Sequence, residues 1–193
     1  MTELVLFHHA HGLTDGVLSF ADTIRSAGHL VHTPDLYDGE RFEEMADGVG
    51  HAELIGFSTF IERGLIAVED LPPDVVYAGM SLGVLPAEML ALTRPGARGA
   101  VLLSGCAAPD ELGAPWPQAV PLQIHLMDAD EWVVPPNEDL EAARALQAGT
   151  EDAELFIYSG DRHLFADVST AHYDADAAVL LTSRLLEFLG RVG

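Results

Sequence analysis

The stretch "YAGMSLGVLP", residues 77–86, places one serine between two glycines directly after an apolar run. That run, "DVVYAG" (74–79), is typical of a buried strand. In a simple strand-ending turn, the glycines would only punctuate the strand and Ser81 would need no special role. In a nucleophile elbow, Gly79 and Gly83 would leave room for a tight strand-to-helix turn that holds the serine hydroxyl above the sheet. The rest of the chain has to discriminate between these two explanations.

Strand patterns and helix patterns alternate on both sides of this segment. Five further strands are predicted, over 3–9, 29–36, 99–105, 122–127 and 153–159. Helices are predicted over 15–28, within 40–69, over 82–93 and 137–149, and from about 173 to 189. Near-continuous apolar strands that alternate with helices indicate a parallel sheet covered on both faces. We therefore expect a three-layer α/β fold, with a mostly parallel sheet and helices on both faces, in a single domain over 1–193.

The composition excludes several classes of partner. The formal charge is -22, with nine basic residues against 31 acidic ones, so nucleic acids and anionic membranes would be repelled. No apolar run approaches the roughly 20 residues of a membrane span, and the first strand lacks a basic leader and a cleavage site. We expect a cytoplasmic protein with a small-molecule partner, and the sequence leaves open whether two copies form a homodimer.

Polar side chains with complementary chemistry follow three of the predicted strands. They are Ser81, the pair Asp128 and Asp130, and His163. The carboxyl ends of parallel strands share one edge of the sheet, so these groups can meet although they are far apart in sequence. A serine hydroxyl needs a neutral imidazole to accept its proton, and the imidazole needs a carboxylate to fix its tautomer and stabilise its charged form. The sequence therefore predicts a catalytic triad, with either aspartate as the acid.

The oxyanion of an acyl-transfer reaction needs two donors in addition to these side chains. One backbone N–H would come from Leu82, directly after the serine, and the other from Ala10 in the loop after the first strand. Backbone donors leave little trace in a sequence, so this assignment depends on position alone.

Five stretches in chain order carry a resemblance to a known family. They are "LFHHAHGLTDGVLSFADTIRSAGHLVHTPDLYDGE" (6–40), "GMSLG" (79–83), "DADEWVVPP" (128–136), "YSGDRHLF" (158–165) and "YDADAAVLLTSRLLEFL" (173–189). Along nearly its whole length the chain resembles the dienelactone hydrolase family of small α/β-hydrolases. The elbow motif alone has little specificity, whereas the ordered set is specific.

The resemblance implies an activity and a role for each residue. Ser81 would be the nucleophile, His163 the base and Asp130 the acid, because the family's acid is followed by a segment similar to "EWVVPP". The protein would cleave a small ester, lactone or thioester through an acyl-Ser81 intermediate, without a metal or cofactor. The alternative is a non-catalytic protein that keeps the fold and binds a small ligand or partner in its cleft.

Three positions depart from the enzymes that gave the family its name. Ser81 stands where they have cysteine, His9 where they have a glutamate near the nucleophile, and Asp167 where an arginine helps to hold a substrate carboxylate. An aspartate cannot replace the fork of donors of an arginine. A dienelactone, or another substrate with a carboxylate, is therefore not expected.

The remaining candidate residues have more than one explanation. Trp132 and Phe165 flank the predicted triad and would line an apolar pocket or belong to the core. His9 and His11 would face the substrate pocket or, as a pair, ligate a metal, although three or four ligands are needed and no second His or Cys cluster supplies them. Cys106 has apolar neighbours and is expected to be a buried, inert thiol.

Overall fold

A computed structural model describes residues 1–108 and 111–193. Its six strands form one sheet in the order β2-β1-β3-β4-β5-β6, and every neighbouring pair is parallel. The strands are β1 (Glu3–Phe7), β2 (Leu30–His32), β3 (Val76–Met80), β4 (Gly99–Leu103), β5 (Leu122–Met127) and β6 (Ala153–Tyr158). The expected α/β sheet is confirmed, and the described strands are all parallel rather than mostly so.

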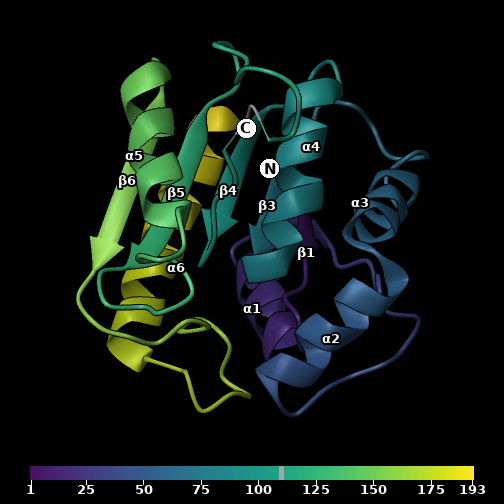
Figure 1. Cartoon of the computed structure of the whole chain (residues 1–193). Coiled ribbons are helices and arrows are strands. Elements are labelled where there is room, and N and C mark those ends of the chain that lie inside the picture. The colour runs from purple at the N-terminus through teal and green to yellow at the C-terminus, as the bar shows by residue number, and fades with distance from the viewer. Residues whose placement is uncertain (109–110) are drawn as a thin grey trace.

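Helices cover both faces of this sheet. They are α1 (Asp15–Ser26), α2 (Met45–Ile55), α3 (Phe57–Ile66), α4 (Val84–Thr93), α5 (Asp139–Gly149) and α6 (Ala175–Val192). In Figure 1, α4 and α5 lie in front of the strands, with α2 and α3 on the same side, and α6 lies behind them. The three-layer arrangement is therefore confirmed. None of the helices in the described part of the chain is long and apolar enough to cross a membrane.

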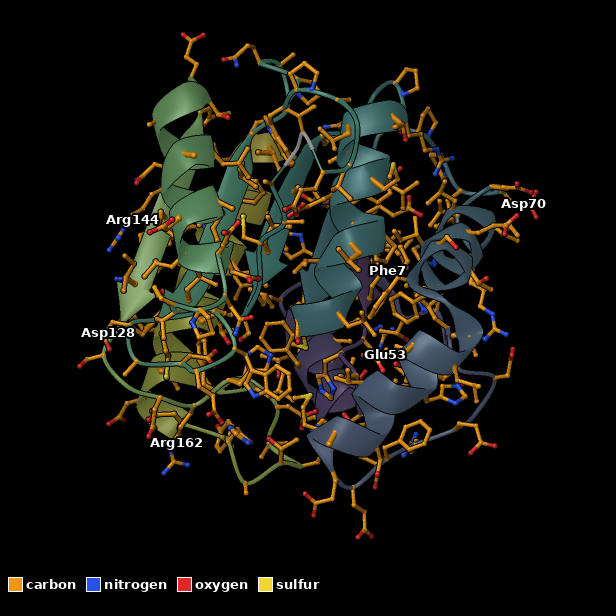
Figure 2. All side chains as sticks on the ribbon, viewed as in Figure 1. Phe7, Glu53, Asp70, Asp128, Arg144 and Arg162 are labelled. Carbon is orange, nitrogen blue, oxygen red and sulfur yellow. The ribbon has the colours of Figure 1, made fainter. Side chains whose placement is uncertain are left out.

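The buried side chains form two clusters, one on each face of the sheet. Val5 and Phe7 of β1 pack in the cluster that also contains residues of α2 to α5, and Figure 2 labels Phe7 beside these helices. Leu4 and Leu6 of the same strand pack in the cluster that contains residues of α1 and α6. Alternate residues of a strand point to opposite faces, so a sheet covered on both faces needs a continuous apolar run.

Several elements have bounds that differ from those predicted, for local reasons. The first strand ends at Phe7 rather than 9, because its backbone pairing with β3 stops at Phe7, and the ring of His8 beyond it accepts a hydrogen bond from the Leu36 N–H at 3.0 Å. The helical region within 40–69 is two helices, because Gly56 between them has φ +87. The last helix begins at Ala175, where the Asp174 side chain caps it.

The strand order places a crevice between β1 and β3. From β1 the chain passes to β2 on one side, and it then returns to β3 on the other side. The loops that leave the carboxyl ends of β1 and β3 therefore diverge, which is where open α/β sheets bind their ligands. Ala10 follows β1 and Ser81 follows β3, so both lie at this crevice.

Candidate active site

Ser81 lies at the tight turn between β3 and α4. Its φ is +50, a left-handed conformation that is uncommon for a residue with a side chain. A Cβ atom on Gly79 would collide with the carbonyl of Gly83, and one on Gly83 would lie 2.5 Å from the carbonyl oxygen of Phe7. Only glycine fits at either position. The turn thus has the geometry of an elbow and not that of a loose strand end.

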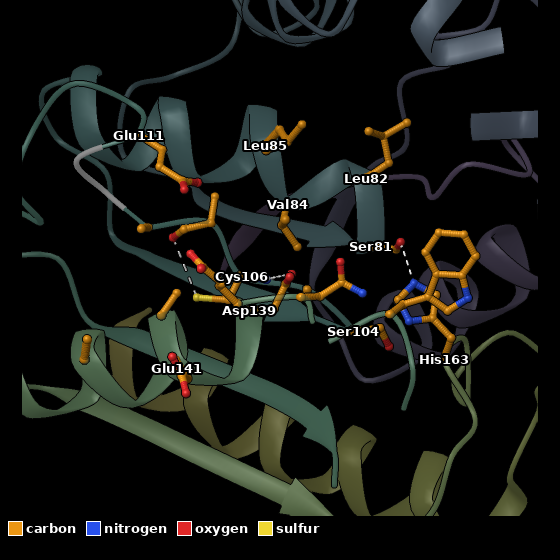
Figure 3. A pocket seen from close by; sticks show the side chains of 18 of the residues that line it. Ser81, Leu82, Val84, Leu85, Ser104, Cys106, Glu111, Asp139, Glu141 and His163 are labelled. Atoms are coloured by element: carbon orange, nitrogen blue, oxygen red, sulfur yellow. Dashed lines mark hydrogen bonds between the residues drawn. The ribbon is translucent and has the colours of Figure 1, made fainter. Parts of the chain in front are cut away.

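The structure brings Ser81, His163 and Asp130 into one hydrogen-bonded series. Ser81 Oγ lies 2.7 Å from His163 Nε2, the dashed contact in Figure 3, and His163 Nδ1 lies 2.7 Å from Asp130 Oδ2. His163 is 3% exposed and Asp130 is 1% exposed. An ionised carboxylate only accepts hydrogen bonds, so His163 Nδ1–H donates to it and Nε2 is left to accept the serine proton.

Asp128, the other acid candidate, does not contact His163. Its Oδ1 accepts a hydrogen bond from the Gly160 N–H at 2.9 Å, and Figure 2 shows its side chain at the outer edge of the molecule. Asp130 instead lies in the interior, where the Trp132 N–H donates to its second oxygen at 3.0 Å. Of the two aspartates that follow β5, the structure therefore brings Asp130 to the imidazole.

The loop after β1 lies directly against the elbow. The carbonyls of Phe7 and His8 approach Gly83 so closely that a Cβ there would clash with both. Ala10, two residues further on, is 1% exposed, and its N–H donates to no described residue. This N–H is therefore available to an acceptor other than the described residues. The Leu82 N–H belongs to the turn that starts at Ser81.

A cavity of about 660 Å³ opens beside Ser81 and His163. Figure 3 shows the end of β4, the start of α4 and the N-terminal part of α5 around it. Four acidic side chains are among its lining residues: Glu111, Glu138, Asp139 and Glu141. No arginine is among the lining residues that the structure describes. The cavity therefore presents a strongly negative wall to a bound molecule.

Two buried titratable groups lie at this wall: Cys106 is among the residues that line the cavity, and Glu88 is not. Glu88 of α4 is 1% exposed, and burial raises the pKa of its carboxyl well above the usual value. Its Oε1 accepts from the Ala107 N–H at 3.1 Å, and its Oε2 has no partner among the described residues. Cys106 is 2% exposed, and burial also raises the pKa of its thiol. The prediction of a buried thiol is confirmed, and burial favours the neutral form of both groups.

The four side chains proposed to line the substrate pocket lie in different places. Trp132, with its ring centre 5.8 Å from that of His163, lines the cavity. Phe165 packs in the core against Tyr158, at 5.0 Å between ring centres, and is outside the cavity lining. His11 lines a separate hollow. His9 is fully buried and outside the cavity, because its ring is hydrogen-bonded to Asp167.

The metal alternative has no donor set in this arrangement. The rings of His9 and His11 meet edge to face, with centres 5.4 Å apart. His9 Nε2 is bonded to Asp167, and His9 Nδ1 lies 3.3 Å from the His11 N–H. Within residues 1–108 and 111–193, no group of three or more His, Cys, Asp or Glu side chains is placed to hold an ion.

Sequence reasoning missed two features near the site. One is Glu88, an acid within the apolar helix pattern of residues 84–93. A charged residue at a position where the pattern predicts a core residue could have indicated it. Asp167 was noted only as a replacement for an arginine. Its pairing with His9 left no signal, because a single sequence does not show contacts between residues that are 158 positions apart.

Comparison with known proteins identifies a family over nearly the whole chain. The model of the dienelactone hydrolase family matches residues 2–193. A search of curated protein sequences finds no match.

Solved structures with the same fold include three hydrolases. A dienelactone hydrolase-like promiscuous phosphotriesterase from metagenomic libraries has a TM-score of 0.75 at 17% identity and covers 100% of this chain and 87% of its own. A putative dienelactone hydrolase from Klebsiella pneumoniae has a TM-score of 0.75 at 15% identity, with coverage of 99% and 87%. The thioesterase domain from the curacin biosynthetic pathway has a TM-score of 0.65 at 15% identity, with coverage of 96% and 90%. At these identities the likeness establishes a shared fold.

Proposed function

Because this chain belongs to the dienelactone hydrolase family, we propose that it is a serine hydrolase that cleaves a small ester, lactone or thioester through an acyl-Ser81 intermediate. The observation that carries the proposal is the continuous series from Ser81 Oγ to His163 and on to Asp130, with both contacts at 2.7 Å. Nucleophile, base and orienting acid within hydrogen-bond reach of each other are the signature of an activated serine.

The reaction follows from the roles of these atoms. Ser81 Oγ attacks the substrate carbonyl while its proton passes to His163 Nε2, and Asp130 stabilises the imidazolium. The carbonyl oxygen becomes an oxyanion that accepts hydrogen bonds from the N–H groups of Ala10 and Leu82. The imidazolium then gives its proton to the leaving alcohol or thiol. Water, deprotonated by the same imidazole, releases the acid and regenerates the serine.

The negative wall of the cavity limits the charge of the substrate. A substrate carboxylate about 8 Å from one ionised acid would be disfavoured by about 2 kcal/mol at an effective dielectric constant near 20. The cavity has four acids and no described arginine to offset them. We therefore infer that the substrate is neutral or cationic, unlike a dienelactone, which carries a carboxylate.

Reaction with a fluorophosphonate tests the proposal, because such reagents phosphonylate activated serines. Intact-mass spectrometry should show one adduct on the parent protein, which peptide mapping places on Ser81. Ser81→Ala and His163→Ala should form no adduct, with circular dichroism to establish that both are folded. Short-chain esters, lactones, thioesters and a phosphotriester would then define the substrate class. A folded parent protein that forms no adduct would contradict the proposal and favour the non-catalytic, ligand-binding alternative.

A further inference from the structure

A buried histidine–aspartate pair joins the loop that carries His163 to the loop that carries Ala10. Asp167 lies four residues after His163, and His9 lies directly before Ala10. His9 Nε2 is 2.7 Å from Asp167 Oδ2, and both side chains are 0% exposed. Neither residue lines the cavity beside Ser81. The pair therefore connects two parts of the candidate active site without facing the substrate.

The charge state of the pair follows from the groups around it. Burial alone would raise the pKa of Asp167, but hydrogen bonds from His9, Ser169 and Thr14 together lower it below the usual value. Ser169 donates through both its N–H, at 2.7 Å, and its hydroxyl, at 2.6 Å. Burial lowers the pKa of His9. An ionised Asp167 therefore faces a neutral His9, whose Nε2–H donates and whose Nδ1 carries the free lone pair.

That lone pair is directed to the backbone around Ala10. His9 Nδ1 accepts the N–H of His11 at 3.3 Å, so the ring bridges the two residues that flank Ala10. The ring of His11 is fixed in turn, because its Nδ1 donates to the Phe42 carbonyl at 2.8 Å. On the other side, Gly48 of α2 packs so tightly on the Ala10 carbonyl that a Cβ there would collide with it.

We propose that His9 and Asp167 are positioning residues that hold the Ala10 N–H in the geometry needed for the oxyanion and tie that loop to the loop of His163. The ionised Asp167 selects the tautomer of His9, and only that tautomer can accept the His11 N–H. The proposal depends on the proposed function, because it assigns Ala10 a role in that reaction. His9 and Asp167 act through the Ala10 N–H that they orient. Their loss is therefore expected to destabilise the transition state more than it weakens substrate binding.

The alternative is that His9 and Asp167 only stabilise the fold. Replacement of Thr14 provides a matched control for such a loss of stability. Thr14 also donates to Asp167, at 2.6 Å, and it caps α1 by accepting the Val17 N–H at 3.1 Å. Thr14→Ala should therefore lower stability by about 1 kcal/mol, as loss of a cap does. It removes one donor to Asp167, but the contact with His9 and the two donors of Ser169 remain to keep that carboxylate ionised.

The test compares four variants in stopped-flow hydrolysis of p-nitrophenyl acetate: Asp167→Asn, His9→Gln, the double variant and Thr14→Ala. Loss of one oxyanion donor slows acyl transfer by about 10²–10³-fold, and a misplaced donor should cost about 10–100-fold. We expect both acylation and deacylation to slow by that factor in Asp167→Asn and His9→Gln, with KM within about threefold. The double variant should be no slower than the slower single variant, since the two residues act as one unit. Thr14→Ala should stay within about threefold of the parent.

Two results would overturn the proposal. One is an Asp167→Asn variant that loses no more activity than Thr14→Ala at a matched loss of stability. The other is a double variant in which the two losses multiply. A readout independent of catalysis separates these failures from a failure of the proposed function: the ¹H–¹⁵N resonance of the Ala10 amide should shift in Asp167→Asn and stay in place in Thr14→Ala. A folded parent protein that neither hydrolyses p-nitrophenyl acetate nor forms a fluorophosphonate adduct would contradict the proposed function, whereas an unmoved Ala10 resonance would contradict the positioning role.

Discussion

Two serines end neighbouring parallel strands of this sheet and share an unusual backbone conformation. Ser81 follows β3 with φ +50, and Ser104 follows β4 with φ +57. The strands are in register, with Met80 opposite Leu103, and both serines line the same cavity. Only Ser81 has an imidazole at hydrogen-bond distance. Within the described residues, the hydroxyl of Ser104 makes no hydrogen bond.

The segments that follow the two serines explain this difference. After Ser81, the chain turns at once into α4, and Gly83 lets the elbow approach the loop of Ala10. After Ser104, the chain enters a loop that Asp139 holds by accepting the Cys106 N–H at 2.9 Å. A left-handed serine at a strand end is therefore insufficient for activation. A base and backbone donors must converge on it as well.

Alanine at each serine tests this comparison most directly. Ser81→Ala should lower kcat/KM for p-nitrophenyl acetate by at least about 10³-fold, because the nucleophile is lost. Ser104→Ala should stay within about threefold, since its hydroxyl contacts no described catalytic group. Fluorophosphonate should label Ser104→Ala as it labels the parent protein, and it should not label Ser81→Ala. An equal loss in both variants would mean that the two strand ends share a role in catalysis.

The two aspartates after β5 provide the next contrast. Asp130→Asn should lower kcat by about 10²–10⁴-fold, because an amide no longer fixes the required tautomer of His163. Asp128→Asn should change kcat by less than about threefold, since its exposed carboxylate accepts, among the described residues, only the Gly160 N–H. Steady-state kinetics of the two variants at equal folded concentration measure both effects. A larger loss in Asp128→Asn would reverse the assignment of the acid.

The sequence predicted those parts of the molecule that depend on local pattern and chain order. The apolar strands and the spacing of helices predicted the three layers. The polar residues after three strands predicted which side chains would meet, since all parallel strands end at one edge. The choice of Asp130 over Asp128 came from a family resemblance, and the structure then placed Asp130 beside His163.

Other contacts between distant segments were not predictable from the sequence. His9 and Asp167 are individually ordinary, and only the fold places them 2.7 Å apart. The acids of the cavity wall are scattered between Glu111 and Glu141, within stretches that look like solvated loop and helix surface. Phe165 was expected to line the pocket or to belong to the core, and its ring packs in the core on the α6 face of the sheet.

The acidic wall next to Ser104 is expected to discriminate between substrates by their charge. Replacement of Glu111 and Glu141 by glutamine should raise kcat/KM for p-nitrophenyl hemisuccinate, which bears a carboxylate, by about 3–10-fold at low salt. The rate with neutral p-nitrophenyl acetate should change less than twofold. Added salt should reduce the gain, because it screens exposed charges. Equal changes for both substrates would show that the wall acts through shape and not through charge.

The smallest expected effect is that of replacing Glu88, whose buried carboxyl is expected to lower the stability of the folded protein at high pH. Burial raises the pKa of this carboxyl in the folded state well above the value of 4.5 that it has when solvated. Above pH 4.5 the unfolded chain releases this proton while the folded chain keeps it. The unfolded state then binds fewer protons, so this group makes the free energy of unfolding fall as pH rises. Glu88→Gln removes that penalty.

The melting temperature of Glu88→Gln should therefore exceed that of the parent by about 2–4 °C at pH 8, the shift that about 1 kcal/mol produces in a domain of this size. The difference should vanish near pH 4, where both states of the parent are protonated. Glu53→Gln, at an exposed position on α2 that Figure 2 labels, is the control and should change the melting temperature little at either pH. A Glu88→Gln variant less stable than the parent at pH 8 would mean that the carboxyl is ionised and paired in the fold. The wall beyond Ser104 would then hold one more negative charge, and the exclusion of carboxylate substrates would be stronger still.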